Sequence, residues 1–265
     1  MLREELPVSG VKIFKGMAFI AAIAAIFTHL SAVSAASVVP GPNISGVWER
    51  YPSPFSNDAD VFADLPVPDG GPDLKEPYAS AWKAQRTKRL AAIQVGKPLV
   101  DASTLCLPEG MPTIMGAIYP IQILQTPGQV TVLAEFLTQT RRIYLDQPMP
   151  APDDLAPSYY GFSSGRWDGD TLVIETRGIR EDVQFFEIPH SAAMKITERL
   201  RLIGPDLMEN KIVIDDPAYL KRPYIVTFGY RRKNDYRIME YVCDHLKDVI
   251  NKDGTVSIDA SDGAR

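Results

Sequence analysis

The second half of the chain alternates apolar and polar residues in short runs that turn residues separate. From Pro120 to Cys243 these runs recur at intervals of about ten residues, which is typical of an antiparallel β-meander. Alternate residues of a strand face opposite sides, so each run predicts a strand with one buried face. Pro127-Gly128 predicts a type II turn, and Asp168-Gly169 predicts a two-residue type I′ hairpin.

The runs predict about nine strands, including one at residues 43–49 and a last one at Tyr236 to Cys243. A sheet of this size has two exposed edges, and closure into a barrel removes them. A two-sheet sandwich remains the alternative, because strand patterns alone do not distinguish the two folds. We therefore predict an all-β fold, with an antiparallel meander closed into a barrel.

The first half of the chain predicts little regular structure apart from one helix. Residues 76–94 are rich in Ala, Lys, Arg and Gln, which indicates a helix with a basic outer face that could cover one end of the barrel. The stretch before it, residues 52–77, is rich in Pro, Asp and Gly and predicts a long covering loop. The polar residues after Asp244 predict a fraying tail.

The N-terminus has the features of a secretory signal peptide. Lys12 and Lys15 precede an apolar run at 17–30, and small residues follow at 31–36. An uncleaved membrane anchor is the alternative. We expect a signal peptide at 1–36, a single barrel domain at 37–243 and a flexible C-terminal tail at 244–265, in a periplasmic or secreted protein without stable membrane insertion after cleavage.

Composition excludes several classes of partner. The 265 residues include 28 Lys plus Arg and 33 Asp plus Glu, a formal net charge of -5, without a basic block. Nucleic acid therefore has no electrostatic footprint here. We also find no phosphate-binding glycine loop, dinucleotide fingerprint or haem-attachment motif, so we expect no tightly held cofactor. The sequence leaves the oligomeric state open.

Cys106 and Cys243 are the only cysteines, and in an exported chain an even number favours a disulfide. Zinc ligation by these two with His190 and His245 is the alternative, but the usual paired spacings of zinc ligands are absent. We expect no metal site.

A set of motifs carries a family resemblance. The segments are Ser45–Glu49, Cys106–Pro112 (Cys-Leu-Pro-Glu-Gly-Met-Pro), Gln125–Gly128, Gly165–Thr176 (Gly-Arg-Trp-Asp-Gly-Asp-Thr-Leu-Val-Ile-Glu-Thr), Pro189–Ser191, Glu198–Leu200 and Glu240–Cys243. Together they resemble an uncharacterised family of secreted bacterial proteins, and that resemblance implies no activity. Gly46-Val47-Trp48 also resembles the Gly-x-Trp motif of lipocalins, which implies a lipocalin-like barrel with an internal ligand cavity.

Strand alternation points three carboxylates into the expected barrel, Glu135, Glu198 and Glu240. A carboxylate on an apolar face needs a partner, and either Arg141 or Arg142 must face inward as well. We expect Glu198 to act as a general acid or base beside a ligand, with Arg142 or Arg141 stabilising developing negative charge. A buried ion pair that sets strand register is the alternative.

His190 precedes the strand that carries Glu198, at a position expected on the barrel rim. It is the expected general acid or base, with a surface histidine in a turn as the alternative. Aromatic residues would line the cavity with Glu135 and Glu240; those expected to do so are Tyr144, Tyr160, Phe162 and Phe186.

These features predict an exported barrel that binds a hydrophobic or aromatic small molecule and transforms it by cofactor-independent acid/base chemistry, as an isomerase, lyase or hydrolase. A non-catalytic carrier and an envelope accessory protein are the alternatives.

Overall fold

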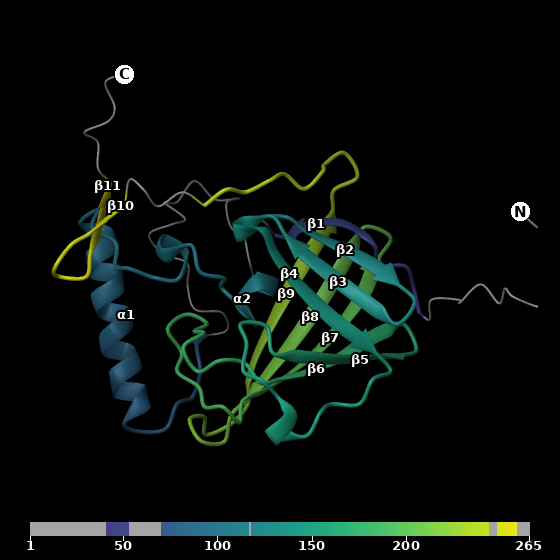
Figure 1. The fold of residues 1–265 in the computed structure, drawn as a ribbon, viewed down its shortest axis with the longest axis horizontal. Helices are drawn as coiled ribbons and strands as arrows, with labels where there is room; N and C mark the ends of the chain where they lie inside the picture. Colours follow the sequence, from purple (N-terminus) through teal and green to yellow (C-terminus); the bar gives the residue numbers. More distant parts are fainter. Residues whose placement is uncertain (1–40, 53–69, 117, 244–247, 259–265) are drawn as a thin grey trace, which may run out of the picture. The chain divides into compact units, whose positions relative to one another are not determined.

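The main element of the protein is a closed nine-stranded β-barrel (Figure 1). This computed structural model describes residues 41–52, 70–116, 118–243 and 248–258. The barrel strands are β1 (Gly46–Arg50), β2 (Ile121–Thr126), β3 (Gln129–Ala134), β4 (Gln139–Leu145), β5 (Phe162–Asp168), β6 (Thr171–Arg177), β7 (Lys195–Gly204), β8 (Leu207–Asp215) and β9 (Tyr224–Arg232). They follow one another in chain order, and β9 pairs with β1. The all-β barrel is confirmed, and the fold is not a sandwich.

Two details of the predicted meander are wrong. Strands β4 and β5 are parallel, because residues 146–161 carry the chain back before β5 begins. Residues Tyr236 to Cys243 form no strand. Strand β1 takes that place instead, with Trp48 opposite Arg232 of β9. Each barrel strand has two neighbours, so β8 and β1 leave β9 no free edge for a further strand.

The two predicted turns differ in how they form. Gly128 has a φ of 77°, as the third position of a type II turn requires. In the β5–β6 hairpin, Asp168 pairs with Thr171, and the two loop residues are Gly169 and Asp170. Only Gly169 of these two has a positive φ, 63°. The turn is therefore not type I′, which needs a positive φ at both loop positions.

The predicted helix is confirmed as α1 (Tyr78–Gln94). No residue of α1 is fully buried, but Tyr78 and Trp82 are half-buried against the core. The other helical segments are short: η2 (Ser103–Leu105), α2 (Thr113–Gly116), η3 (Phe136–Thr138) and η4 (Pro152–Asp154). Within the described ranges, we find no helix of the length and apolar character that a bilayer span requires.

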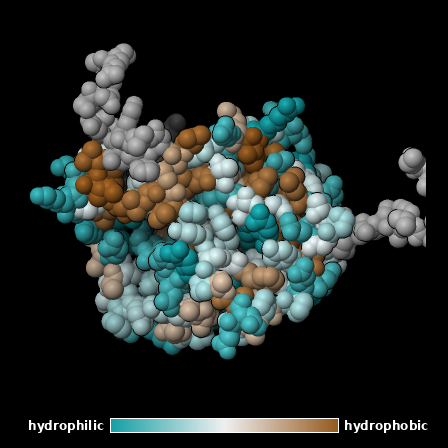
Figure 2. Space-filling model, in the orientation of Figure 1, coloured by the Kyte–Doolittle hydropathy of each residue, from teal (hydrophilic) through white to brown (hydrophobic). Residues whose placement is uncertain are grey.

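The segment after Cys243 contains a hairpin where we expected a fraying tail. Strands β10 (Asp248–Ile250) and β11 (Val256–Ile258) pair with each other, and Val256 N–H donates to the Pro98 carbonyl (2.8 Å). Figure 2 shows apolar side chains gathered around this hairpin and the end of α1, where Val95 and Ile250 are exposed. The predicted signal peptide at 1–36 and most of the predicted loop at 52–77 lie outside the described residues.

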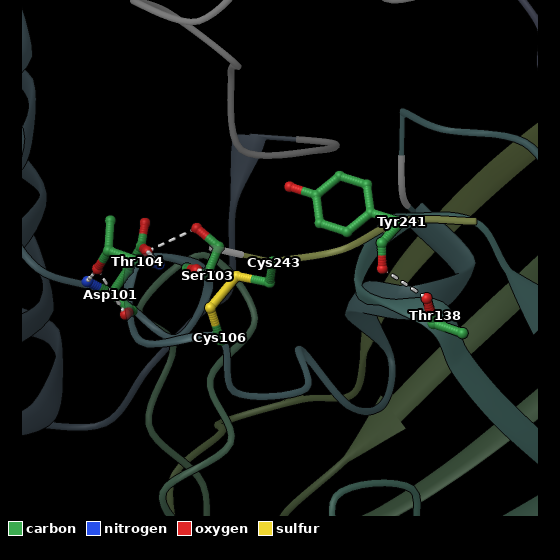
Figure 3. The surroundings of a disulfide bond; sticks show 7 residues. All are labelled: Asp101, Ser103, Thr104, Cys106, Thr138, Tyr241 and Cys243. Carbon is green, nitrogen blue, oxygen red and sulfur yellow. Dashed lines mark hydrogen bonds between the residues drawn. A yellow bond between two sulfur atoms is a disulfide. The ribbon is translucent and has the colours of Figure 1, made fainter. Parts of the chain in front are cut away.

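Residues 233–243, which we call the C-terminal strap, run from β9 to a disulfide. Tyr236 Oη donates to Glu135 Oε2 (2.7 Å), and Thr138 Oγ1 donates to the Tyr241 carbonyl (2.8 Å). The strap ends at the predicted disulfide, Cys106–Cys243 (Figure 3). This bond ties the strap to the loop that leads from α1 to the barrel.

Candidate functional site

The barrel interior holds an ion pair between two of the predicted site residues. Arg141 on β4 and Glu198 on β7 are both buried, and the guanidinium donates to both carboxylate oxygens, with Nη1 lying 3.1 Å from Oε1 and Nη2 contacting Oε2. The prediction that Glu198 faces inward is therefore confirmed. Of the two neighbouring arginines it is Arg141 that faces inward, while Arg142 is exposed.

Polar side chains from neighbouring strands complete this ion pair. Arg141 Nη2 also donates to Ser163 Oγ (3.2 Å) and Thr176 Oγ1 (3.1 Å), and Asn210 Nδ2 donates to Glu198 Oε1 (2.9 Å). Strands β4 to β8 thus contribute one residue each to a buried network. A fully hydrogen-bonded buried charge pair is well suited to hold strand register, and both carboxylate oxygens of Glu198 are engaged in it.

His190 is buried at one end of the barrel, apart from this network. Its Nε2 lies 2.7 Å from the Val183 carbonyl oxygen and its Nδ1 lies 3.1 Å from that of Ser191. It lines a small apolar cavity of about 20 Å³, with room for about one water molecule. Glu198 does not line this cavity, so the structure does not bring His190 and Glu198 together at one pocket.

Several residues expected to line an internal cavity lie elsewhere. Tyr144 and Phe162 stack on each other on the outer face of β4 and β5, with ring centroids 5.1 Å apart. They share that face with Arg142, because the buried positions of β4 are its odd-numbered residues. Glu240 is exposed in the strap, since its segment is not a barrel strand. The predictions that Tyr144, Phe162 and Glu240 line an internal cavity were therefore wrong.

Glu135 is buried, but it lies beyond the end of β3 rather than inside a longer strand. The carboxylate accepts hydrogen bonds from Tyr236 Oη and from the Met239 amide (3.0 Å). Leu137 and Thr138 have positive φ values of 57° and 48°, which ends the strand alternation there. Glu135 therefore anchors the strap.

A larger space lies outside the barrel, in a cleft of about 490 Å³. One wall is α1, a second is the 100–109 loop, and a third is the 182–187 loop. The lining residues are Gln85, Arg86, Arg89, Leu90, Ile93, Val100, Asp101, Ala102, Ser103, Leu107, Pro108, Glu109, Thr113, Tyr159, Asp182, Val183, Gln184, Phe186 and Glu187. Phe186 is the one predicted ligand-binding residue among them.

Helix α1 is held over the 182–187 loop by polar contacts. Trp82 Nε1 donates to the Phe186 carbonyl (2.9 Å). Arg86 Nη1 lies 2.9 Å from Glu187 Oε2, and Arg89 Nε lies 2.5 Å from Glu187 Oε1. Two cations of the predicted basic outer face thus turn toward the cleft, because the half-buried carboxylate of Glu187 attracts them.

Glu109 is a half-buried carboxylic acid that lines the cleft. Its backbone N–H donates to Gln139 Oε1 (3.0 Å). The next residue, Gly110, has a φ of 70°, and a Cβ there would lie 2.4 Å from the Tyr159 carbonyl oxygen. Only glycine fits this turn, which sets the position of Glu109 against the barrel end.

Burial and the neighbouring Asp101 carboxylate raise the pKa of Glu109 to about 7, and a hydrogen bond with the Gln139 side chain opposes this rise. Burial, followed by the negative charge of Glu109, raises the pKa of Tyr160 to about 12. Tyr160 Oη donates to Gln139 Oε1 (3.3 Å), so this predicted residue lies beside Glu109. A carboxyl that titrates near neutrality can serve as either acid or base.

Sequence reasoning missed Glu109 and the role of α1. Glu109 lies inside the Cys-Leu-Pro-Glu-Gly-Met-Pro motif, three residues after a cysteine of the predicted disulfide and directly before a glycine. Arg86 and Arg89 are three residues apart, so they share one side of a helix. These signals could have marked the loop and the helix face, although neither indicates that the two meet.

A search with models of protein families finds no match to this chain, and no curated protein matches it.

Proposed function

We propose that the chain is an exported barrel protein that binds a hydrophobic or aromatic small molecule in the cleft beneath α1, with Glu109 as its acid/base group. The observation that carries this proposal is a cleft of about 490 Å³ with Glu109 among the residues of its wall. Small-molecule sites typically measure about 300–1,000 Å³ and combine apolar walls with a few polar groups. The ligand site thus lies outside the barrel.

The chemistry follows from the environment of Glu109. Near pH 7 it is present in both protonated and ionised forms, so it can donate or accept a proton without a large energetic cost. In this proposal Glu109 takes the acid/base role that we expected from the sequence for His190 and Glu198. Isomerase, lyase or hydrolase reactions that need a single proton carrier and no cofactor are compatible with it.

Export is supported by the disulfide and by the N-terminal sequence. The Cys106–Cys243 bond is of the kind that persists in the periplasm or outside the cell. The signal-like segment at 1–36 would direct the chain there.

The proposal can be tested with N-phenyl-1-naphthylamine, a neutral aromatic probe whose fluorescence rises when it leaves water. We expect saturable binding to the full exported chain, and we expect Ala102→Trp to abolish it. Ala102 lines the cleft and is exposed, so a large side chain there fills the space without disturbing the core. Ala84→Trp is the matched control, because Ala84 is exposed on α1 and does not line the cleft.

Equal binding by the wild type and Ala102→Trp would contradict the cleft as the binding site. A carbon-13 NMR titration of the Glu109 carboxyl provides the second measurement. A midpoint near 7 supports the acid/base role, whereas a midpoint near the ordinary value of about 4.3 contradicts it.

A further inference from the structure

We propose that the ligand of the cleft is an organic cation, with an ammonium group that pairs with Glu109 and an apolar body that packs between α1 and the 100–109 loop. The inference rests on the proposed function and names the class of molecule that the site accepts.

The other carboxylates of the cleft already have partners. Glu187 pairs with Arg86 and Arg89 of α1. Asp182 Oδ1 accepts from Arg180 Nε (2.8 Å). Their charges are therefore balanced within the protein.

Asp101 is also engaged, as Figure 3 shows. Its Oδ1 accepts from Ser103 Oγ (2.7 Å) and from the Thr104 amide (3.0 Å). Its Oδ2 lies 3.4 Å from Arg89 Nη1. This carboxylate holds the turn at the start of the 100–109 loop.

Glu109 differs because no Lys, Arg or His of the described residues forms an ion pair with it. The titratable groups that act on it or respond to its charge are Asp101, Tyr160 and Tyr241, all of which are neutral or negative. The cleft thus holds one carboxyl that lacks a counter-charge. An anionic ligand would add repulsion, a neutral one would bury the carboxyl further, and a cation supplies the missing charge.

The rest of the cleft suits an apolar body on that cation. Leu90 and Ile93 of α1 face Leu107 and Pro108 of the loop across the same space. Tyr159 and Phe186 also line it and add apolar surface. An ammonium ion without an apolar body would leave these walls in contact with water.

Two isosteric probes test the charge alone. Phenyltrimethylammonium and tert-butylbenzene have the same shape, but only the first is charged, and its charge does not change with pH. Each competes with N-phenyl-1-naphthylamine at pH 5.5 and 8.5, after the affinity of that dye has been measured at both pH values. We expect the cation to bind about tenfold more tightly at pH 8.5, where Glu109 is ionised, and the neutral isostere to show no such gain.

Glu109→Gln should remove this pH dependence and weaken the cation about tenfold at pH 8.5. Glu175→Gln, on the outer face of β6, is the matched control and should behave as wild type. Equal competition by the two probes at pH 8.5, unchanged in Glu109→Gln, would overturn the inference and leave the cleft as a binding site. Failure of both probes, with dye binding insensitive to Ala102→Trp, would overturn the inference and the proposed function together.

Discussion

The barrel interior and the cleft each hold a buried or half-buried carboxyl, and the two differ in their counter-charge. Glu198 meets the guanidinium of Arg141 and an amide of Asn210. Glu109 feels the negative charge of Asp101, and it forms no ion pair with a cation in the part of the chain that the structure describes. A paired carboxylate is committed to structure, whereas an unpaired one near an open space keeps its capacity to bind and to exchange protons.

Burial alone therefore does not identify a functional acid. Strand alternation selects Glu198 because its face of β7 is otherwise apolar. On that face, however, side chains from β4 to β8 form the buried network that neutralises the charge of Glu198. No ligand is needed to balance this charge. Glu109 is less buried than Glu198, but its pKa is raised and no described cation pairs with it.

Removal of Arg141 should have the largest effect, because it turns Glu198 into an unpaired buried carboxylate. Arg141→Met leaves Glu198 buried without its partner, so we expect the free energy of unfolding to fall by up to about 5 kcal/mol in urea denaturation. Arg142→Met is the matched control. Because Arg142 is exposed on the same strand, its loss should cost less than about 0.5 kcal/mol.

The double variant Arg141→Met, Glu198→Leu tests whether the fold requires the ion pair itself or only that no buried charge is left unpaired. It removes both charges together, and we expect it to regain much of the lost stability. If Arg141→Met were no less stable than Arg142→Met, the buried pair could not be what holds β4 and β7 in place.

The disulfide comes next, because it joins the strap to the loop that carries Glu109. Replacing Cys106 and Cys243 by Ser opens a covalent link across 137 residues. We expect a loss of about 4 kcal/mol or less in the free energy of unfolding. Hydrogen exchange should show a larger fall in protection for the 100–109 loop than for the amides of β7 and β8, which report global unfolding.

Uniform loss of protection across the barrel and the loop would contradict this assignment. The bond would then stabilise the whole fold and not the cleft in particular. Single Cys→Ser variants are avoided, because each leaves a free thiol that can form dimers.

The sequence predicts the barrel well because its strands obey a local rule. Alternation locates the inward side of β7, and Pro127-Gly128 marks the turn between β2 and β3. The parallel pairing of β4 with β5 could not be found this way, since it depends on where residues 146–161 return the chain. The same limit applies to Tyr236–Cys243, whose apolar pattern suits a strand that has no free edge to join.

The cleft is less predictable for a related reason. Glu109 lies in a loop without periodicity, and its burial arises from Gln139 of β4, Tyr160 and the Asp101 turn. Those contacts join segments that lie far apart in the sequence, so they exist only in the folded barrel. His190 shows the converse, since it lies near Glu198 in sequence but at a cavity that Glu198 does not line.

The smallest predicted effect is a pH dependence of the free energy of unfolding that arises from Glu109. Because the pKa of Glu109 is about 7 in the folded state and near 4.5 when unfolded, the folded state binds more protons between these values. Stability should therefore fall as pH rises through this window, by no more than about 3 kcal/mol once Glu109 is fully ionised. Glu109→Gln lacks this loss. Relative to the wild type, its free energy of unfolding should therefore increase between pH 4.5 and pH 8.5.

Urea denaturation across that range measures the difference, with Glu175→Gln expected to follow the wild type. Parallel curves for Glu109→Gln and the wild type would show that folding does not raise the pKa of Glu109, which would contradict the contrast with Glu198.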